Sequence, residues 1–340
     1  MNIAIISYSK DKASTNIKEN IINNFNFDTN GVGAENKLFS SKLEEKFDNS
    51  NIYQYTINNE NNKKIIKLYT ISSEHIYTDD LDKKINADLF VFISKHSAVE
   101  GRPSLTCHPI GNFGKAEKGG KERTLCPVDS ILLKNIFIEL NKNSDDPDYE
   151  ITMEATHHGP FMEKPVLFVE IGSTEKEWVD GNAGKVIAKS IINAIGKYNE
   201  ESTIIKKFNE KNIINNNILE KQSFSGRRKS KTFSSESKIN ESKNNNYESV
   251  FVIGGGHYNY TANKTMLKSN LAVGHICAKY NLENLDEGLI KEAMEKTIPK
   301  PKFVLLEWKG LGKEKRRIVE LLEKNNIKHE RSDKFFENCE

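Results

Sequence analysis

The chain has 340 residues, 36% of them hydrophobic, and its 50 Lys and Arg nearly balance its 48 Asp and Glu. This length allows one large domain or two, and a formal charge of +2 means that any contact with nucleic acid must rest on a local patch of cations. No stretch approaches the roughly 18 apolar residues of a membrane helix, the N-terminus lacks the basic region of a secretory signal, and the four Cys show no CxxC pairing. We therefore expect a cytoplasmic protein with reduced thiols and no membrane partner.

Short apolar runs alternate with helical patterns along the chain. Continuous apolar runs are typical of strands buried on both faces, and they predict strands at residues 3–7, 89–93, 166–171, 250–253 and 303–306, with a further strand near 149–156. Helical spacing predicts helices at residues 14–25, 127–142, 183–198, 264–280, 286–297 and 313–325. Thr174 and Glu177 have the spacing of a capping box. This alternation predicts an α/β fold with a mostly parallel or mixed sheet and helices on both faces.

Two polar segments interrupt this alternation, at residues 27–62 and 200–247. The second has no periodic apolar face, so it cannot bury enough apolar area to offset the entropy of the chain. We expect a single α/β domain formed by residues 1–199 and 248–335, with 200–247 as a disordered, low-complexity insertion. Its basic run at residues 227–231 could touch RNA, but a tolerated surface insertion is the simpler interpretation.

The histidine distribution points to a site. Five of the eight His fall in short polar patches beyond apolar runs: His96, His108, His157, His158 and His257. Neutral imidazole is the commonest metal ligand, and its pKa lies near neutrality. The run Glu154-Ala-Thr-His-His-Gly-Pro160 suits a metal or acid–base site better than core packing, although solvated loop histidines are the alternative. If residues 151–158 are extended, His157 turns away from Glu154 unless the strand has ended.

The other three His are expected to be structural or exposed. His275 lies within the predicted helix at residues 264–280, where we expect it to pack against neighbouring helices. His75 and His329 lie in polar neighbourhoods and are expected at the surface.

Four of the polar patches begin just after predicted strands, at Ser94, His157, Gly254 and Glu307. In open α/β sheets ligands bind outside the carboxyl ends of the strands, so these patches are expected to converge on one cleft. The glycine-rich stretch at residues 101–120, which includes Gly111 and Gly114, could present N–H groups to a phosphate or a terminal ribose, or it could be a flexible loop without a ligand. Cys107 is expected to be buried rather than nucleophilic.

One dense group of cations lies near a predicted strand end. It consists of Lys309, Lys313, Lys315, Arg316 and Arg317. Together with a helix N-terminus, such a group would suit a phosphodiester backbone, but it could equally be an ordinary solvated helix face.

Five motifs together resemble a known family. They are Ser94-Lys-His96-Ser97, Leu105-Thr-Cys-His-Pro-Ile-Gly-Asn-Phe-Gly114, Glu154-Ala-Thr-His-His-Gly-Pro160, Glu170-Ile-Gly-Ser173 with Trp178, and Gly254-Gly-Gly-His-Tyr258. In this order they are similar to the archaeal and plant type of D-aminoacyl-tRNA deacylase, the zinc-dependent D-tyrosyl-tRNA deacylase family. Two departures are visible. The chain reads Asn259-Tyr-Thr where the family usually has Ala-Pro-Arg, and the segment at 200–247 is unusually large.

The resemblance implies hydrolysis of the ester that joins a D-amino acid to the 3′ end of tRNA, with zinc as cofactor. It also implies a fold related to peptidyl-tRNA hydrolase and nucleoside phosphorylases, and we expect a monomer. The candidate catalytic residues are His96, Glu154, His157, His158 and His257. The candidate metal ligands are His96, His108, Glu154, His157 and His158, whose metal and catalytic roles the sequence does not separate. The candidate substrate-binding residues are Gly111, Asn112, Gly114, Glu170, Ser173, Lys309, Lys313 and Arg317.

This chemistry fits the residues independently of the resemblance. An aminoacyl ester is already activated, so an enzyme needs only a positioned water and stabilisation of charge at the carbonyl oxygen. A metal could activate the water, or a His could act as general base on a water that no metal binds. The alternatives are a nucleoside phosphorylase-like enzyme and a non-catalytic RNA-binding module.

Overall fold

The computed structural model describes residues 1–24, 42–59, 62–99, 101–198 and 247–337. Except for residue 247, the predicted insertion at 200–247 lies outside the described residues, as does part of the polar segment at 27–62. Among the described residues, no helix is long and apolar enough to cross a membrane.

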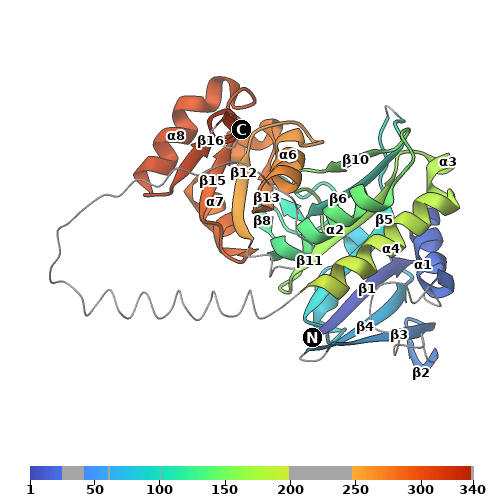
Figure 1. Ribbon diagram of the computed structural model, residues 1–340. Helices are drawn as coiled ribbons and strands as arrows, with labels where there is room; N and C mark the ends of the chain where they lie inside the picture. Colours follow the sequence, from blue (N-terminus) through green and yellow to red (C-terminus); the bar gives the residue numbers. More distant parts are fainter. Residues whose placement is uncertain (25–41, 60–61, 100, 199–246, 338–340) are drawn as a thin grey trace. The chain divides into compact units, whose positions relative to one another are not determined.

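The large sheet has eight strands in the order β10-β6-β11-β5-β1-β4-β3-β2 (Figure 1). In chain order these strands are β1 (Asn2–Tyr8), β2 (Lys42–Phe47), β3 (Ser50–Asn59), β4 (Asn62–Ile71), β5 (Leu89–Lys95), β6 (Ser104–Pro109), β10 (Glu150–Met153) and β11 (Val166–Gly172). The central strands β4, β1, β5 and β11 are parallel to one another. In contrast, β6 runs antiparallel to β11, and β10 is parallel to β6. The α/β class with a mixed sheet is therefore confirmed.

A second sheet has four strands in the order β13-β12-β15-β16, and every pair in it is parallel. Its strands are β12 (Glu248–Ile253), β13 (Leu271–Cys277), β15 (Phe303–Leu306) and β16 (His329–Arg331). Short strands form two further pairs: β7 (Gly111–Asn112) with β8 (Thr124–Leu125), and β9 (Val128–Asp129) with β14 (Thr297–Ile298).

Helices cover these sheets in two groups. The large sheet carries α1 (Lys12–Asn24), α2 (Ser130–Asn143) and α4 (Gly181–Lys197), which pack side by side (Figure 1). The small sheet is flanked by α6 (Tyr260–Lys268), α7 (Glu287–Glu295) and α8 (Lys315–Lys324). Apolar residues of α7 and α8 join those of β12 and β15 in one buried cluster, and α6 packs on β13.

The remaining described helical elements are short. They are α3 (Glu175–Trp178), α9 (Ser332–Glu337) and four 3-10 turns, namely η1 (His75–Tyr77), η2 (Leu81–Lys83), η3 (Lys279–Asn284) and η4 (Gly312–Glu314). The predicted capping box is confirmed, because the Glu177 carboxylate accepts the Thr174 N–H at 3.0 Å at the start of α3.

The predicted helix at residues 264–280 is wrong in its second half. The helix α6 ends at Lys268, and the chain then forms β13, in which all seven residues are buried. The run Leu-Ala-Val-Gly-His-Ile-Cys is continuously apolar apart from His275, which is the pattern of a strand covered on both faces. Gly274 lets Thr297 approach closely, since a Cβ there would lie 2.3 Å from its side chain.

Strands also form inside the polar segment at residues 27–62, where β2 and β3 pair antiparallel and β3 pairs antiparallel with β4. In β3 the β-branched residues Ile52 and Ile57 are buried among polar neighbours. Asn-rich composition concealed this strand, because tertiary pairing overrides a weak local preference.

Three histidines occupy positions other than those predicted. His75 is 2% exposed in η1, where its ring meets the edges of Phe92 and Tyr8, and His275 is wholly buried in β13 rather than in a helix. Burial lowers the pKa of each to about 3. His329, also expected at the surface, is half-buried in β16.

A buried cation closes the end of α4. The Lys64 ammonium, on β4, donates to the carbonyls of Ile195 at 2.8 Å, Gly196 at 3.2 Å and also Tyr198. The Tyr198 hydroxyl in turn donates to the Asp129 carboxylate at 2.6 Å. The last carbonyls of the helix, which have no partners within it, are thus satisfied from the sheet.

We predict that the free energy of unfolding falls as the pH drops from 7 to 5. His75 and His275 stay neutral in the folded protein but take up protons near pH 6.5 when unfolded, so each should cost about 2 kcal/mol at pH 5. Replacing His75 by Phe should flatten the pH dependence of Tm, whereas His329→Ala should not. An equally steep dependence in His75→Phe would contradict this account.

Candidate active site

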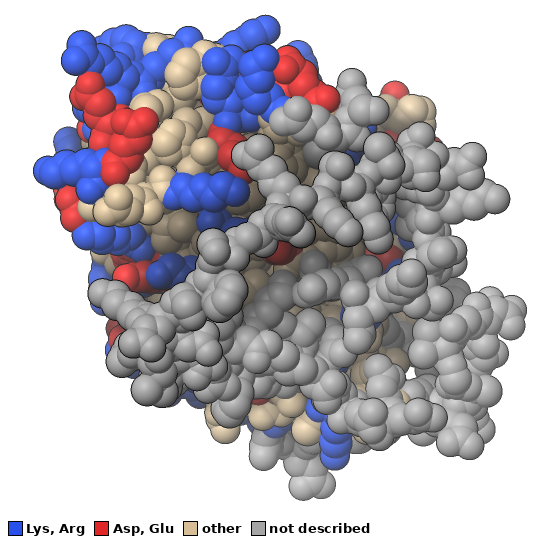
Figure 2. Space-filling view, turned by 60° about the vertical axis from the view of Figure 1, so that its left-hand side comes forward, with Lys and Arg blue, Asp and Glu red and all other residues tan. Residues whose placement is uncertain are grey.

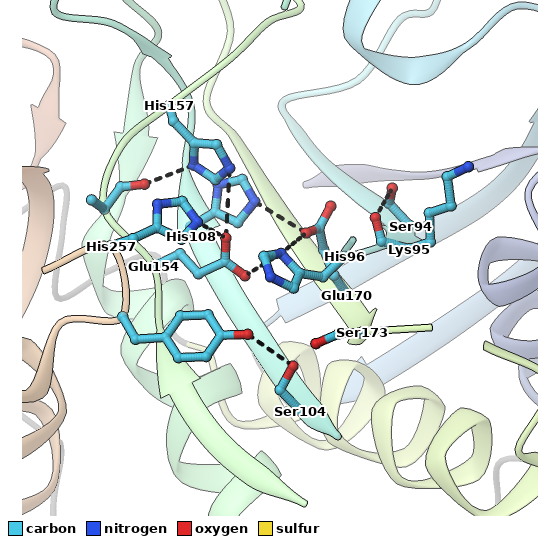
Figure 3. Close-up of polar contacts among 12 residues, drawn as sticks. Ser94, Lys95, His96, Ser104, His108, Glu154, His157, Glu170, Ser173 and His257 are labelled. Atoms are coloured by element: carbon cyan, nitrogen blue, oxygen red, sulfur yellow. Dashed lines mark hydrogen bonds and ion pairs between the residues drawn. The ribbon is translucent and has the colours of Figure 1, made fainter. Parts of the chain in front are cut away.

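Histidines and carboxylates from separate parts of the chain meet over one face of the large sheet (Figure 3). In the register of β6 with β11, His108 pairs with Phe168 and Thr106 pairs with Glu170. Alternation along the strands therefore places His108 and Glu170 on the same face. The predicted convergence of polar patches is confirmed for Ser94-Lys-His96, Glu154-to-His158 and His257.

The geometry of this convergence differs from the prediction. The patches do not line a single row of carboxyl ends, because β6 and β10 run antiparallel to β11. The fourth patch, at Glu307, packs against the patch that begins at Gly254. A Cβ on Gly254 would come within 2.8 Å of the Glu307 carbonyl oxygen. The Glu307 carboxylate accepts the Gly310 N–H, so this patch supports the glycine turn before His257.

Glu154 is the centre of the site and is wholly buried. One carboxylate oxygen lies 2.9 Å from His257 Nε2 and 3.5 Å from His157 Nε2. The other lies 3.1 Å from His96 Nδ1. Three imidazoles therefore surround one carboxylate (Figure 3).

A second buried carboxylate, Glu170, lies behind the first. Its Oε2 is 3.6 Å from His96 Nδ1 and 3.7 Å from His108 Nε2. His96 is thus placed between two carboxylates, which makes it the natural cation of the cluster.

The pKa shifts follow this arrangement. Burial acts against the charge on Glu154, but the hydrogen bonds from His257 and His96 hold its pKa well below the ordinary value. Burial likewise opposes the charge on His96, yet Glu154 and Glu170 raise its pKa to about 10. Burial and the neighbouring His108 lower the pKa of His158 to about 4, and burial together with His158 lowers that of His157 well below its usual range. Two carboxylate anions, a cation and two neutral imidazoles therefore coexist within one cluster at neutral pH.

The turn that carries His157 and His158 begins where β10 ends, at Met153. Beyond this point the Thr156 N–H donates to the Ile276 carbonyl at 3.0 Å, and the Gly111 N–H donates to the His158 carbonyl at 2.9 Å. Because the strand has ended, His157 is not turned away but points at Glu154.

The His275 ring contacts the same turn. Its ring lies 3.2 Å from the Thr156 hydroxyl and 3.0 Å from the Cys126 carbonyl oxygen. The hydroxyl also accepts the Ile276 N–H at 2.9 Å. Sequence reasoning missed this role because it placed His275 in a helix.

Three imidazoles of the site direct Nδ1 at a backbone carbonyl. His108 Nδ1 and His158 Nδ1 lie 3.1 and 2.6 Å from the carbonyl of the following residue, and His157 Nδ1 lies 2.8 Å from the Ala155 carbonyl. A carbonyl only accepts, so Nδ1 carries a proton, and in a neutral ring Nε2 then keeps a free lone pair. This is the outer support that metal-bound imidazoles have.

The donor set therefore fits a metal ion. Ligand atoms of His108, His157 and His158 lie within 4.8 Å of one another. The same holds for two further groups, His96 with Glu154 and His257, and His108 with Glu154 and Glu170. The buried Nε2 atoms of His96 and His108 have no hydrogen-bond partner. Unpaired donors or acceptors are costly in a protein interior unless a ligand or an ion meets them.

The glycine-rich stretch supports the histidines from within the protein. Gly111 adopts φ +133, and a Cβ there would lie 2.5 Å from the Leu125 backbone. The Asn112 amide donates to the carbonyls of Gly119 at 3.0 Å and Lys121 at 3.2 Å. Gly114 packs against η3, the 3-10 turn at Lys279–Asn284. The expected contact of Gly111, Asn112 and Gly114 with substrate stays a prediction.

Hydroxyl groups line another side of the site. Ser104 and Ser173 lie near the cluster (Figure 3). The Ser104 and Tyr258 hydroxyls are 3.1 Å apart, and the Ser173 hydroxyl donates to the Arg102 carbonyl at 2.5 Å. Sequence reasoning selected Ser173 but missed Ser104, whose position at the start of β6 carries no local signal.

The Lys and Arg residues after β15 differ in what they contact. Arg317 donates to the carbonyls of Leu282 and Leu285 and, at 2.6 Å, to the Glu314 carboxylate. Its guanidinium holds η3 in place, and its expected contact with substrate stays a prediction. Lys309 follows β15 and Lys313 lies in η4, and Lys and Arg gather with acidic residues on this part of the molecule (Figure 2).

The departure at Asn259-Tyr-Thr has a structural role. Asn259 is buried, and its side-chain oxygen accepts the Ala262 N–H at 2.9 Å, which caps α6. Its amide donates to the Gly254 carbonyl at 2.9 Å. This residue therefore fixes the glycine turn to the helix that follows it.

A buried carboxylate among neutral and cationic imidazoles, set in an α/β fold, defines a hydrolytic type of enzyme site. The family model for D-aminoacyl-tRNA deacylase matches residues 83–330. The D-aminoacyl-tRNA deacylase of Pyrococcus furiosus is 30% identical, covering 94% of this chain and 95% of its own length. That of Methanosarcina mazei is 29% identical, covering 99% and 94%. The chain belongs to the D-aminoacyl-tRNA deacylase family.

Solved structures agree with this fold. The crystal structure of a conserved protein of unknown function superposes with a TM-score of 0.69 at 26% identity, covering 98% of this chain and 96% of that one. A Campylobacter jejuni 5′-methylthioadenosine/S-adenosyl homocysteine nucleosidase has a TM-score of 0.34 at 13% identity over 58% of this chain, and no argument rests on so small a likeness.

Proposed function

We infer that the chain hydrolyses the ester bond between a D-amino acid and the 3′ end of tRNA, releasing both. The observation that carries this conclusion is the family match over most of the chain, which includes every histidine of the site. The buried carboxylate and its imidazoles supply the groups that ester hydrolysis requires. The two alternatives, phosphorolysis and passive RNA binding, account neither for the family match nor for the buried carboxylate with its imidazoles.

The residues divide the chemistry among themselves. Glu154 and His257 lie 2.9 Å apart and are suited to accept and hold the proton that a water loses as it attacks the ester. His96, a cation between two carboxylates, is suited to offset negative charge that develops on the carbonyl oxygen. No nucleophilic side chain is needed, and Cys107 is wholly buried with its pKa raised by that burial.

We further propose that His108, His157 and His158 hold a zinc ion. Zinc favours imidazole nitrogen and a tetrahedral site with one open position, and when bound it would lower the pKa of a water and polarise the ester carbonyl. The support is the orientation of the three rings, whose Nδ1 atoms all face backbone carbonyls. His96 and Glu154, the other predicted ligands, are then left to proton transfer and charge stabilisation.

Discrimination between D- and L-aminoacyl-tRNA is the direct test of activity. We predict rapid deacylation of the D form and little of the L form. Glu154→Gln, which removes the charge but keeps the size, should reduce kcat/KM by at least about 100-fold. Glu150→Gln, at the other end of β10, serves as the matched control. Equal rates on both substrates would refute the proposed function.

Zinc binding is predicted to depend on the three imidazoles. A competition titration with a chromophoric chelator should show that His158→Ala weakens zinc affinity by about 10-fold to 100-fold or more, because one ligand and its support are lost. His329→Ala, outside the site, should leave the affinity unchanged. Unaltered affinity in His158→Ala would place the metal elsewhere.

We propose that Lys309 and Lys313 contact phosphates near the 3′ end of the tRNA. Replacing both by Ala should raise KM and flatten its dependence on salt, with kcat nearly unchanged, because backbone contacts contribute to binding through charge. Replacing Lys185 and Lys189 of α4, two exposed lysines, removes the same charge as a control. If both double variants behave alike, the tRNA is bound by other groups.

A further inference from the structure

Tyr280 extends the site toward solvent. Its hydroxyl lies 3.0 Å from His257 Nδ1, and the other nitrogen of that ring lies 2.9 Å from Glu154 Oε2. Exposure rises along this series, from 0% for the Glu154 side chain to 36% for that of His257 and 49% for Tyr280. The three side chains thus form a line from the buried carboxylate to the surface.

Of the two contacts, that of Tyr280 with His257 is a hydrogen bond, and that of His257 with Glu154 is a close approach of a ring nitrogen to a carboxylate oxygen. A carboxylate oxygen attracts a protonated nitrogen, so this approach favours the His257 tautomer with the proton on Nε2. In a neutral ring the other nitrogen then has a lone pair and accepts from the Tyr280 hydroxyl. That hydroxyl keeps its proton at neutral pH, because burial and the nearby Glu154 raise the pKa of Tyr280 to about 12.

We propose that Tyr280 is a positioning residue, whose hydroxyl holds His257 in the Nε2–H tautomer with Nε2 facing Glu154. This proposal rests on the proposed function only for its consequence in catalysis. The geometry itself concerns three side chains of the folded protein.

His257 differs from three other imidazoles of the site in the group that its Nδ1 atom contacts. Around His108, His157 and His158 the Nδ1 atom meets a backbone carbonyl, which leaves Nε2 free to bind a metal. At His257 the Nδ1 atom meets a hydroxyl, which can donate, whereas Nε2 faces a carboxylate as it does in His157. The difference among these rings therefore lies in the partner of Nδ1, and the sequence does not reveal it.

The backbone holds this pair in a fixed relation. Tyr280 lies in η3, whose first N–H, that of Lys279, donates to the Gly255 carbonyl at 2.9 Å. Gly255 belongs to the turn that leads into His257. The far end of η3 is held by Arg317, through the carbonyls of Leu282 and Leu285. The hydroxyl and the ring are thus carried by segments that are bonded to each other.

Kinetics of Tyr280→Phe test the role, because this variant removes only the hydroxyl. We expect kcat on D-aminoacyl-tRNA to fall by about 10-fold to 100-fold while KM changes less than about twofold. In a His257→Gln background the same change should have no further effect, since the hydroxyl acts through the ring. Tyr77→Phe, at another exposed tyrosine, is the control. A raised KM with unchanged kcat, or additive losses in the double variant, would overturn the proposal.

A spectroscopic measurement decides the tautomer without substrate. In protein labelled with ¹⁵N in its histidine rings, the His257 signals, assigned by their loss in His257→Gln, should show a protonated Nε2 and a bare Nδ1. Tyr280→Phe should shift the population toward the other tautomer or toward exchange between the two. A protonated Nδ1 and bare Nε2 in the wild type would overturn the proposal even if the enzyme is active. Absence of deacylation with the expected tautomer would refute only the proposed function.

Discussion

The charge of one buried carboxylate determines how the site is built. Glu154 lies beyond the reach of solvent, and an ion there is stable only if surrounding groups replace its hydration. His257 and His96 do this at about hydrogen-bond distance, and Glu170 keeps His96 charged in turn. Removing one of these groups weakens the set of contacts that compensates the buried charges. The stability of each charged group in the cluster therefore depends on the others.

The fold brings these groups together from both sheets. The large sheet supplies Glu170 and His108 from adjacent antiparallel strands, and the loop after β12 of the small sheet supplies His257. The Ala155 N–H donates to the His257 carbonyl at 2.8 Å, which ties the turn after β10 to the loop from the other sheet. The catalytic geometry thus depends on how the two sheets are packed, and a mutation in either core can misplace it.

Much of this arrangement could be predicted from the sequence. Continuous apolar runs identified the buried strands because burial on both faces leaves a local pattern, and the polar patches behind them contained His96, Glu154 and His257. Other features left no such pattern. The strand around His275 resembled a helix, and Ser104 and Tyr280 reach the site only through tertiary packing. Arg317 donates to carbonyls of η3, a contact that the sequence does not show because it depends on which oxygens lie nearby in the fold.

The capping of α4 by Lys64 has a consequence for how the chain can vary. Tyr198 is the last residue that the structure describes before residue 247; its carbonyl accepts from the Lys64 ammonium and its hydroxyl donates to Asp129. The chain then enters the small sheet at β12, which begins at Glu248. The carbonyls at the end of α4 therefore have partners in β4, and Tyr198 is fixed to the N-cap of α2. A change in the length of the connection between Tyr198 and Glu248 should leave this helix end intact, as long as the chain still reaches β12.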